Sequence, residues 1–210
     1  MTSQQSLAPY VLLVEGKDDE RFIWQFIASS FHESDFQIVV GEGKSGIPGT
    51  LAAKVKESGF YDTVKAVGIV RDADTDPAAA FQSCCGAFAR AGLDVPELPG
   101  VFTTGVPRTG ALILPSADAR GELETLCLQA IEAAPGAKKN MACVDGYVTC
   151  LESAGLSIKR REKTRLYTFL AAKPEPSLKL GEAFQAGYIP LDGPAFDGVR
   201  AFLEAMISDS

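Results

Sequence analysis

The stretch VLLVEGKDDERF, residues 11–22, indicates the class of fold. Its first four residues are apolar and too few to form a helix, so they predict a buried strand that begins at Tyr10. Glu15 and Gly16 end this strand, and apolar residues then recur at helical spacing through residues 18–30. In parallel α/β sheets, binding sites form at the carboxyl ends of strands. The position of Glu15 therefore predicts a site at this strand end.

The same alternation continues along the next part of the chain. Apolar runs predict strands at residues 36–40 and 65–70, and helical spacing predicts helices at 47–58 and 77–91, the last ending at Gly92. Residues 101–115 are predicted to form two short strands around a Gly/Pro turn. Strands that alternate with helices indicate an α/β, Rossmann-like, mostly parallel sheet flanked by helices.

The pattern changes after residue 120, where strand signals stop. The predicted helices of this part cover residues 122–133, 138–153, 162–172 and 194–207. We therefore expect an α/β domain over residues 1–120 and a helical C-terminal extension over residues 121–210, packed on the sheet as a layer.

Composition and charge limit the class of protein. The chain has 210 residues, of which 46% are hydrophobic and 22% charged, as in ordinary globular proteins. No apolar run reaches the roughly 20 residues of a membrane span, and the N-terminus does not resemble a signal peptide. The five scattered cysteines fit reduced thiols, so a cytoplasmic protein is expected. The net charge of −7 argues against nonspecific nucleic-acid binding, although a carboxylate-rich metal site would itself contribute negative charge.

A second strand end also carries carboxylates, in KAVGIVRDADTD, residues 65–76. In extended backbone Asp72 and Asp74 share a face while Ala73 points away, and a neighbouring first strand would bring Glu15 to them. Converging carboxylates stay ionised together when a cation lies between them, and oxygen-only ligands suit Mg²⁺ or Mn²⁺. This chemistry favours phosphoryl transfer or phosphodiester hydrolysis. The alternative is that these acidic residues are solvated loop caps.

The motifs LLVEGKDD and VGIVRDADTD resemble the Toprim domain over residues 9–115, and hence imply a Toprim-like fold. The arrangement is similar to small stand-alone Toprim-like proteins of unknown function and to the Toprim part of overcoming-lysogenization-defect nucleases. The resemblance implies that Glu15 is a metal ligand or the general acid/base, and that Asp72 and Asp74 are metal ligands. It further implies Asp19, Glu122 and Glu124 as candidates for a second metal. For the two glutamates the alternative is favourable charge at a helix N-terminus.

Two basic segments are candidates for phosphate binding. KRREKTRLYTFLAA, residues 159–172, places Lys163 on a helix, where it could stabilise charge developing on phosphate. The alternative is a solvated basic helix face. GEGKSG, residues 41–46, does not match a P-loop, but Gly43 and Lys44 could contact a phosphate. A plain strand-to-helix turn is the alternative there.

These observations predict a Mg²⁺- or Mn²⁺-dependent enzyme that cleaves phosphodiester bonds of DNA or RNA, with Glu15 and Lys163 as catalytic residues. The alternative is a non-catalytic Toprim-like module. Such a module would bind a nucleotide, a nucleic acid or a protein partner such as an ATPase, and the acidic charge of the chain favours it.

Overall fold

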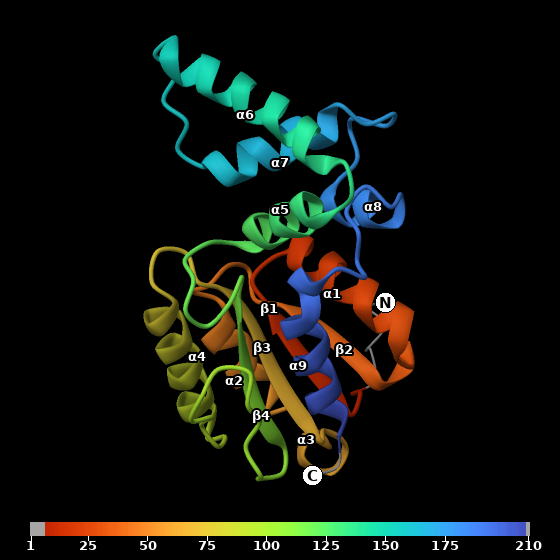
Figure 1. The fold of residues 1–210 in the computed structure, drawn as a ribbon. Helices are drawn as coiled ribbons and strands as arrows, with labels where there is room; N and C mark the ends of the chain where they lie inside the picture. Colours follow the sequence, from red (N-terminus) through yellow and green to blue (C-terminus); the bar gives the residue numbers. More distant parts are fainter. Residues whose placement is uncertain (1–6, 209–210) are drawn as a thin grey trace, which may run out of the picture.

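The central element of the fold is a four-stranded parallel sheet, seen here in a computed structural model that describes residues 7–208 (Figure 1). The prediction that the N-terminus is not a signal peptide concerns a stretch that lies partly outside these residues. The strands are β1 (Tyr10–Val14), β2 (Phe36–Val40), β3 (Ala66–Asp72) and β4 (Arg108–Leu114). Their order is β2-β1-β3-β4, and every neighbouring pair is parallel. The predicted α/β class and parallel sheet are confirmed.

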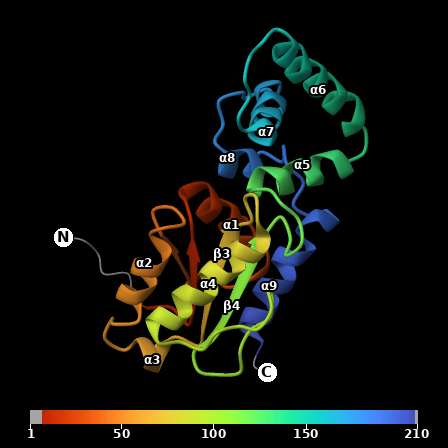
Figure 2. The same cartoon turned by 90° about the vertical axis from the view of Figure 1, so that its left-hand side faces the viewer.

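Helices cover both faces of this sheet (Figures 1 and 2). One face carries α1 (Lys17–Ser30) and α9 (Asp197–Ile207), and the other carries α2 (Ile47–Lys54), the short α3 (Phe60–Thr63) and α4 (Pro77–Ala91). The strand side chains alternate between two cores as period-2 backbone requires. Leu12 and Val14 join the α1/α9 core, whereas Val11 and Leu13 join the α2/α4 core.

The other helices form a lobe beyond the carboxyl ends of the strands (Figure 1). They are α5 (Leu123–Ala133), α6 (Ala137–Ser153), α7 (Arg161–Ala171) and α8 (Leu180–Gln185). Short 3₁₀ turns occur at Glu33–Asp35 and Pro194–Phe196. The C-terminal part is helical as predicted, and its last helix, α9, packs on β3 and β4 of the sheet.

Two secondary-structure predictions are wrong in detail. Within residues 101–115 a single strand forms instead of two, since Gly100 and Thr103 donate only isolated backbone hydrogen bonds to β4 and Pro107 has no N–H to donate. The helix predicted over residues 47–58 ends at Lys54 and is followed by turns that lead to Gly59, whose φ is +81°.

Glycine and aromatic residues hold α9 against the sheet. A Cβ at Gly68 of β3 would lie 3.2 Å from the Phe202 ring of α9, closer than side chains normally pack. The Phe202 ring, fully buried, also stacks on Phe102 with centroids 4.8 Å apart. This contact joins α9 to the segment that precedes β4.

We predict that Phe202→Ala costs about 3–5 kcal/mol of stability, because a buried aromatic leaves a cavity in this core. For a chain of this size the thermal midpoint should fall by roughly 10 °C. Leu98→Ala is the control, since Leu98 is 62% exposed and its truncation should change the midpoint by less than about 2 °C. Equal midpoints for the two variants in thermal unfolding would contradict the packing of α9 on the sheet.

Candidate functional site

The site lies where the strand order reverses direction. From β1 the chain crosses to β2 on one side, and β3 then lies on the other side of β1. In doubly wound sheets this switch point leaves a crevice at the carboxyl ends of the strands. Asp72 ends β3 there, and α1 begins there with Asp19 in its first turn. The strand ends therefore place these two aspartates at one edge of the sheet.

Asp72 and Asp19 are half-buried carboxylates held by backbone donors. The N–H of Leu123 donates to Asp72 Oδ1 at 2.9 Å, and the N–H of Gly16 donates to Asp19 Oδ2 at 2.9 Å. Burial, together with the neighbouring charges of Asp19, Glu15 and Glu124, raises the pKa of Asp72 to about 8. Burial, with Glu15 and Glu124 adding to its effect, raises the pKa of Asp19 to about 6.

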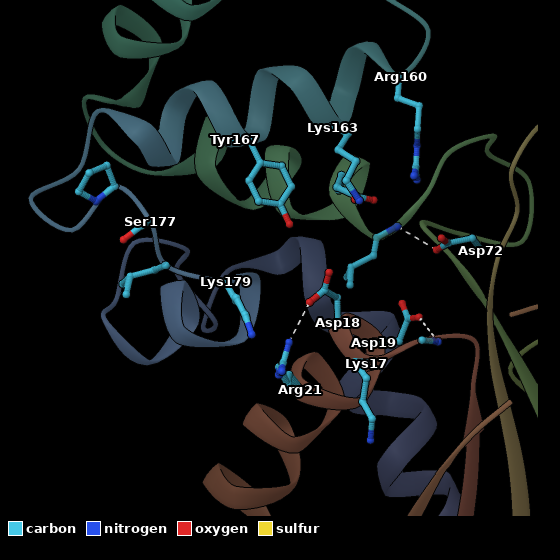
Figure 3. Close-up of a pocket in the computed structure, with 15 residues that line it drawn as sticks. Lys17, Asp18, Asp19, Arg21, Asp72, Arg160, Lys163, Tyr167, Ser177 and Lys179 are labelled. Atoms are coloured by element: carbon cyan, nitrogen blue, oxygen red, sulfur yellow. Dashed lines mark hydrogen bonds and ion pairs between the residues drawn. The ribbon is translucent and has the colours of Figure 1, made fainter. Parts of the chain in front are cut away.

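These two aspartates line a cavity of about 670 Å³ between the sheet edge and the helical lobe (Figure 3). Asp19 comes from α1, whereas Lys163 and Tyr167 project into the cavity from α7 on the opposite side. Basic residues from three segments line it, namely Lys17, Arg21, Arg160, Lys163 and Lys179. A cavity with carboxylates at its bottom and basic side chains around its edge can hold a cation and an anionic group side by side.

Glu124 and Lys163 form an ion pair in the same cavity. Glu124 lies in the first turn of α5 with a side chain that is 8% exposed, and its carboxylate lies 2.8 Å from Lys163 Nζ. Partial burial alone lowers the pKa of Lys163, but the hydrogen bond and charge of Glu124 outweigh it and raise the pKa above its ordinary value. Lys163 therefore stays protonated. The structure thus brings two predicted residues together with Asp19 and Asp72.

Glu15 does not converge with Asp72 as the sequence predicts. Side chains alternate along each strand, so Glu15 follows Val11 and Leu13 towards the α2/α4 face, as Arg71 does. The guanidinium Nε of Arg71 lies 3.2 Å from Glu15 Oε1. Asp72 lies on the other face, although the charge of Glu15 still acts on it. Burial raises the pKa of Glu15, and Asp74 adds to this, whereas Arg71 and Lys44 oppose it.

Asp74 and Glu122 line a second cavity, of about 370 Å³, rather than the first. Ala73 points into the α2/α4 core as predicted, but Asp74 has a φ of +51°, which ends the extended geometry that would have aligned it with Asp72. Asp74 pairs with Lys44 Nζ at 3.0 Å, and Glu122 pairs with Arg160. The structure therefore places Asp72 and Asp74 in two neighbouring cavities that share Arg160 and Lys163.

The Gly43–Lys44 loop is held by the residues that follow β1 and β3. The N–H of Gly43 donates to the carbonyl of Glu15 at 2.8 Å, and Lys44 is held by Asp74. The positive φ of Gly43, +87°, permits this turn. The loop thus has the geometry of a strand-to-helix turn, and Gly43 offers its N–H to the protein.

The arrangement of carboxylates limits how a metal could bind. Among residues 7–208, no three His, Cys, Asp or Glu side chains converge closely enough to hold a metal ion. Mg²⁺ in proteins commonly uses one or two carboxylates and fills its other positions with water and phosphate. Asp19 and Asp72 fit that donor set, because they face one cavity and receive only backbone N–H groups.

Sequence reasoning missed several residues of the first cavity, among them Arg21, Tyr167 and Lys179. Arg21 and Tyr167 lie one helical turn from Lys17 and Lys163, so helical spacing could have found them. Lys179 precedes the six-residue α8, a helix too short for its periodicity to be recognised in the sequence.

Together the fold and cavity define an α/β protein with a half-buried acidic pair and a basic rim at the switch point of a parallel sheet. A family model described as "Protein of unknown function (DUF3226)" matches residues 9–208, so the chain belongs to the DUF3226 family. No curated protein and no solved structure matches the chain. No helix within residues 7–208 is long and apolar enough to cross a membrane.

The raised pKa of Asp72 predicts a pH-dependent stability in metal-free buffer. The folded-state pKa of about 8 exceeds the unfolded value of 3.8, so the folded state binds more protons between these values and stability falls as pH rises through this window. Asp72→Asn removes the charge and retains an acceptor for the Leu123 N–H. We expect this variant to be more stable than wild type by a few kcal/mol near pH 8, and to differ little near pH 4.

Urea unfolding of both proteins in EDTA at several pH values measures this difference. Asp62→Asn is the matched control, because Asp62 is exposed and its neutralisation should leave the pH profile unchanged. Parallel pH profiles for wild type and Asp72→Asn would show that Asp72 titrates like an ordinary aspartate.

Proposed function

We propose that the protein is a Mg²⁺- or Mn²⁺-dependent phosphodiesterase that acts on nucleic acid at the Asp19–Asp72 cavity. The observation that carries this proposal is the half-buried pair of Asp19 and Asp72, for which residues 7–208 supply no ion-pair partner although basic side chains line the same cavity. Like charges in a low-dielectric site favour a bound cation. The Toprim resemblance of the two strand-end motifs agrees with this proposal.

In this proposal Asp19 and Asp72 hold the metal, and Glu124 joins them if Lys163 moves to the substrate. A bound divalent cation would supply Lewis-acid activation of the phosphate and of an attacking water. Lys163 and Arg160 bind the anionic phosphate and stabilise the charge that develops on it. Glu15 has no role in this proposal, because it does not line the Asp19–Asp72 cavity and pairs with Arg71 on the other face of the sheet.

The second cavity has a supporting role in the proposal. Asp74 and Glu122 hold Lys44 and Arg160, and Arg160, which lines both cavities, can exchange its carboxylate for a phosphate. All five cysteines are free thiols, which supports the proposed cytoplasmic location.

Cleavage should require both a divalent metal and Asp72. Purified protein would be incubated with single- and double-stranded DNA and RNA in Mg²⁺, Mn²⁺ or EDTA, beside Asp72→Asn. Mutation of a residue that only hydrogen-bonds to a metal ligand lowers metal affinity or activity by roughly 10- to 100-fold. Asp72→Asn changes a proposed ligand itself, so its cleavage activity should fall by at least that factor. Asp62→Asn, as the surface control, should cleave at the wild-type rate. Metal-dependent cleavage by Asp72→Asn would sink this assignment.

A second candidate function is a non-catalytic module that binds a nucleotide, a nucleic acid or a protein partner such as an ATPase. Four ion pairs favour it, since Glu15, Asp74, Glu122 and Glu124 are each neutralised by a cation of the chain, which leaves few carboxylates for catalysis. Titration calorimetry separates the two candidates. Mg²⁺ binding that is lost in Asp72→Asn, without cleavage of any polynucleotide, would favour the module.

A further inference from the structure

A groove without acidic residues adjoins the proposed catalytic cavity. It has a volume of about 620 Å³, within the range of about 300–1,000 Å³ that is usual for ligand pockets. Arg160, Lys163 and Tyr167 line both spaces, so the groove continues from the rim of the catalytic cavity along α7. Among the described residues, the charged side chains that line the groove are Arg160 and Lys163, which pair with Glu122 and Glu124 outside it.

Two tyrosines flank this groove. Tyr147 of α6 is 54% exposed, and Tyr167 of α7 is half-buried with Lys163 Nζ 5.6 Å from its ring centroid. Between them α7 contributes Thr164, Thr168 and the small Ala171. Flat rings beside hydroxyl groups provide stacking surfaces and hydrogen-bond partners for a planar, polar ring such as a nucleobase.

Ion pairs fix the helices that carry these rings. Arg165 of α7 binds Asp145 of α6, with Nε 2.6 Å from Oδ1, two residues before Tyr147. Arg165 also reaches Glu132 of α5 at 2.8 Å. Because these contacts join α5, α6 and α7, the groove is formed before any ligand arrives, which lowers the ordering cost of binding.

We infer that this groove binds single-stranded nucleic acid, with bases against Tyr147 and Tyr167 and the backbone directed by Arg160 and Lys163 towards Asp72. The inference rests on the proposed function and names its substrate class. A duplex hides its base faces in the stack, whereas an unpaired strand can splay its bases onto aromatic side chains. DNA and RNA strands share this chemistry.

Binding in EDTA tests the groove without cleavage. Fluorescence anisotropy would compare labelled oligothymidylate, oligouridylate and a duplex, each of roughly 15 nucleotides, which suits site sizes of single-strand binders. We expect single strands to bind at least about tenfold more tightly than the duplex. Stacking on one aromatic contributes enough that Tyr147→Ala should weaken single-strand binding by roughly tenfold or more. The DNA and RNA arms identify the preferred strand.

Two further variants keep the test specific. Tyr147→Phe retains the ring and should bind like wild type. Tyr61→Ala removes a tyrosine of equal exposure, 57%, from α3 at the other end of the sheet, and should leave binding unchanged (Figure 1). Wild-type affinity in Tyr147→Ala, or equal affinity for single strands and duplex, would overturn the inference.

The outcomes separate this inference from the proposed function. If wild type cleaves with metal and Tyr147→Ala does so with unchanged KM, the groove assignment fails while the cleavage proposal stands. If wild type binds single strands through Tyr147 but cleaves none of them, the groove assignment stands and the cleavage proposal fails.

Discussion

The backbone pairing that follows β3 sets the position of every other part of the site. Asp74 and Gly121 exchange two backbone hydrogen bonds of 2.9 Å, and the next residues bring the Leu123 N–H to the Asp72 carboxylate. The first turn of α5 is thereby fixed to the end of the sheet. Because α5 packs against α6 and α7, this attachment also places Lys163 and Arg160 above the aspartates. The lobe is therefore positioned by the same strand end that carries the acidic residue.

Charge is distributed unevenly around this attachment. Four carboxylates lie beside cations of the chain that largely cancel their charge, namely Glu15, Asp74, Glu122 and Glu124. Asp19 and Asp72 instead receive one backbone N–H each, which offsets only part of the cost of burying two like charges. The fold thus accepts an electrostatic cost at one place, as proteins commonly do where a ligand supplies the missing charge.

The alternation of side chains along each strand explains why the sequence predicted the sheet and why its prediction that Glu15 and Asp72 converge was wrong. The apolar runs and helical spacings located the sheet and most helices, and Gly92 ends α4 in the left-handed conformation expected of it. The same alternation, applied across neighbouring strands, would have separated Glu15 from Asp72, since their registers place them on opposite faces. The left-handed Asp74 and the return of α9 to the sheet depend on tertiary contacts that no local pattern encodes.

Helix α7 lines both the Asp19–Asp72 cavity and the tyrosine groove. Residues 160, 163 and 167 recur at helical spacing along the cavity that holds Asp72, and residues 164, 168 and 171 form the adjacent stripe along the tyrosine groove. One rigid helix therefore presents cations to the carboxylates and hydroxyl groups to the groove. In the proposed binding mode, an anionic strand that enters along α7 would meet neutral and basic side chains first, and would reach the carboxylates past Lys163. The net negative charge of the protein is thus compatible with an anionic ligand, because local potential rather than total charge governs approach at this range.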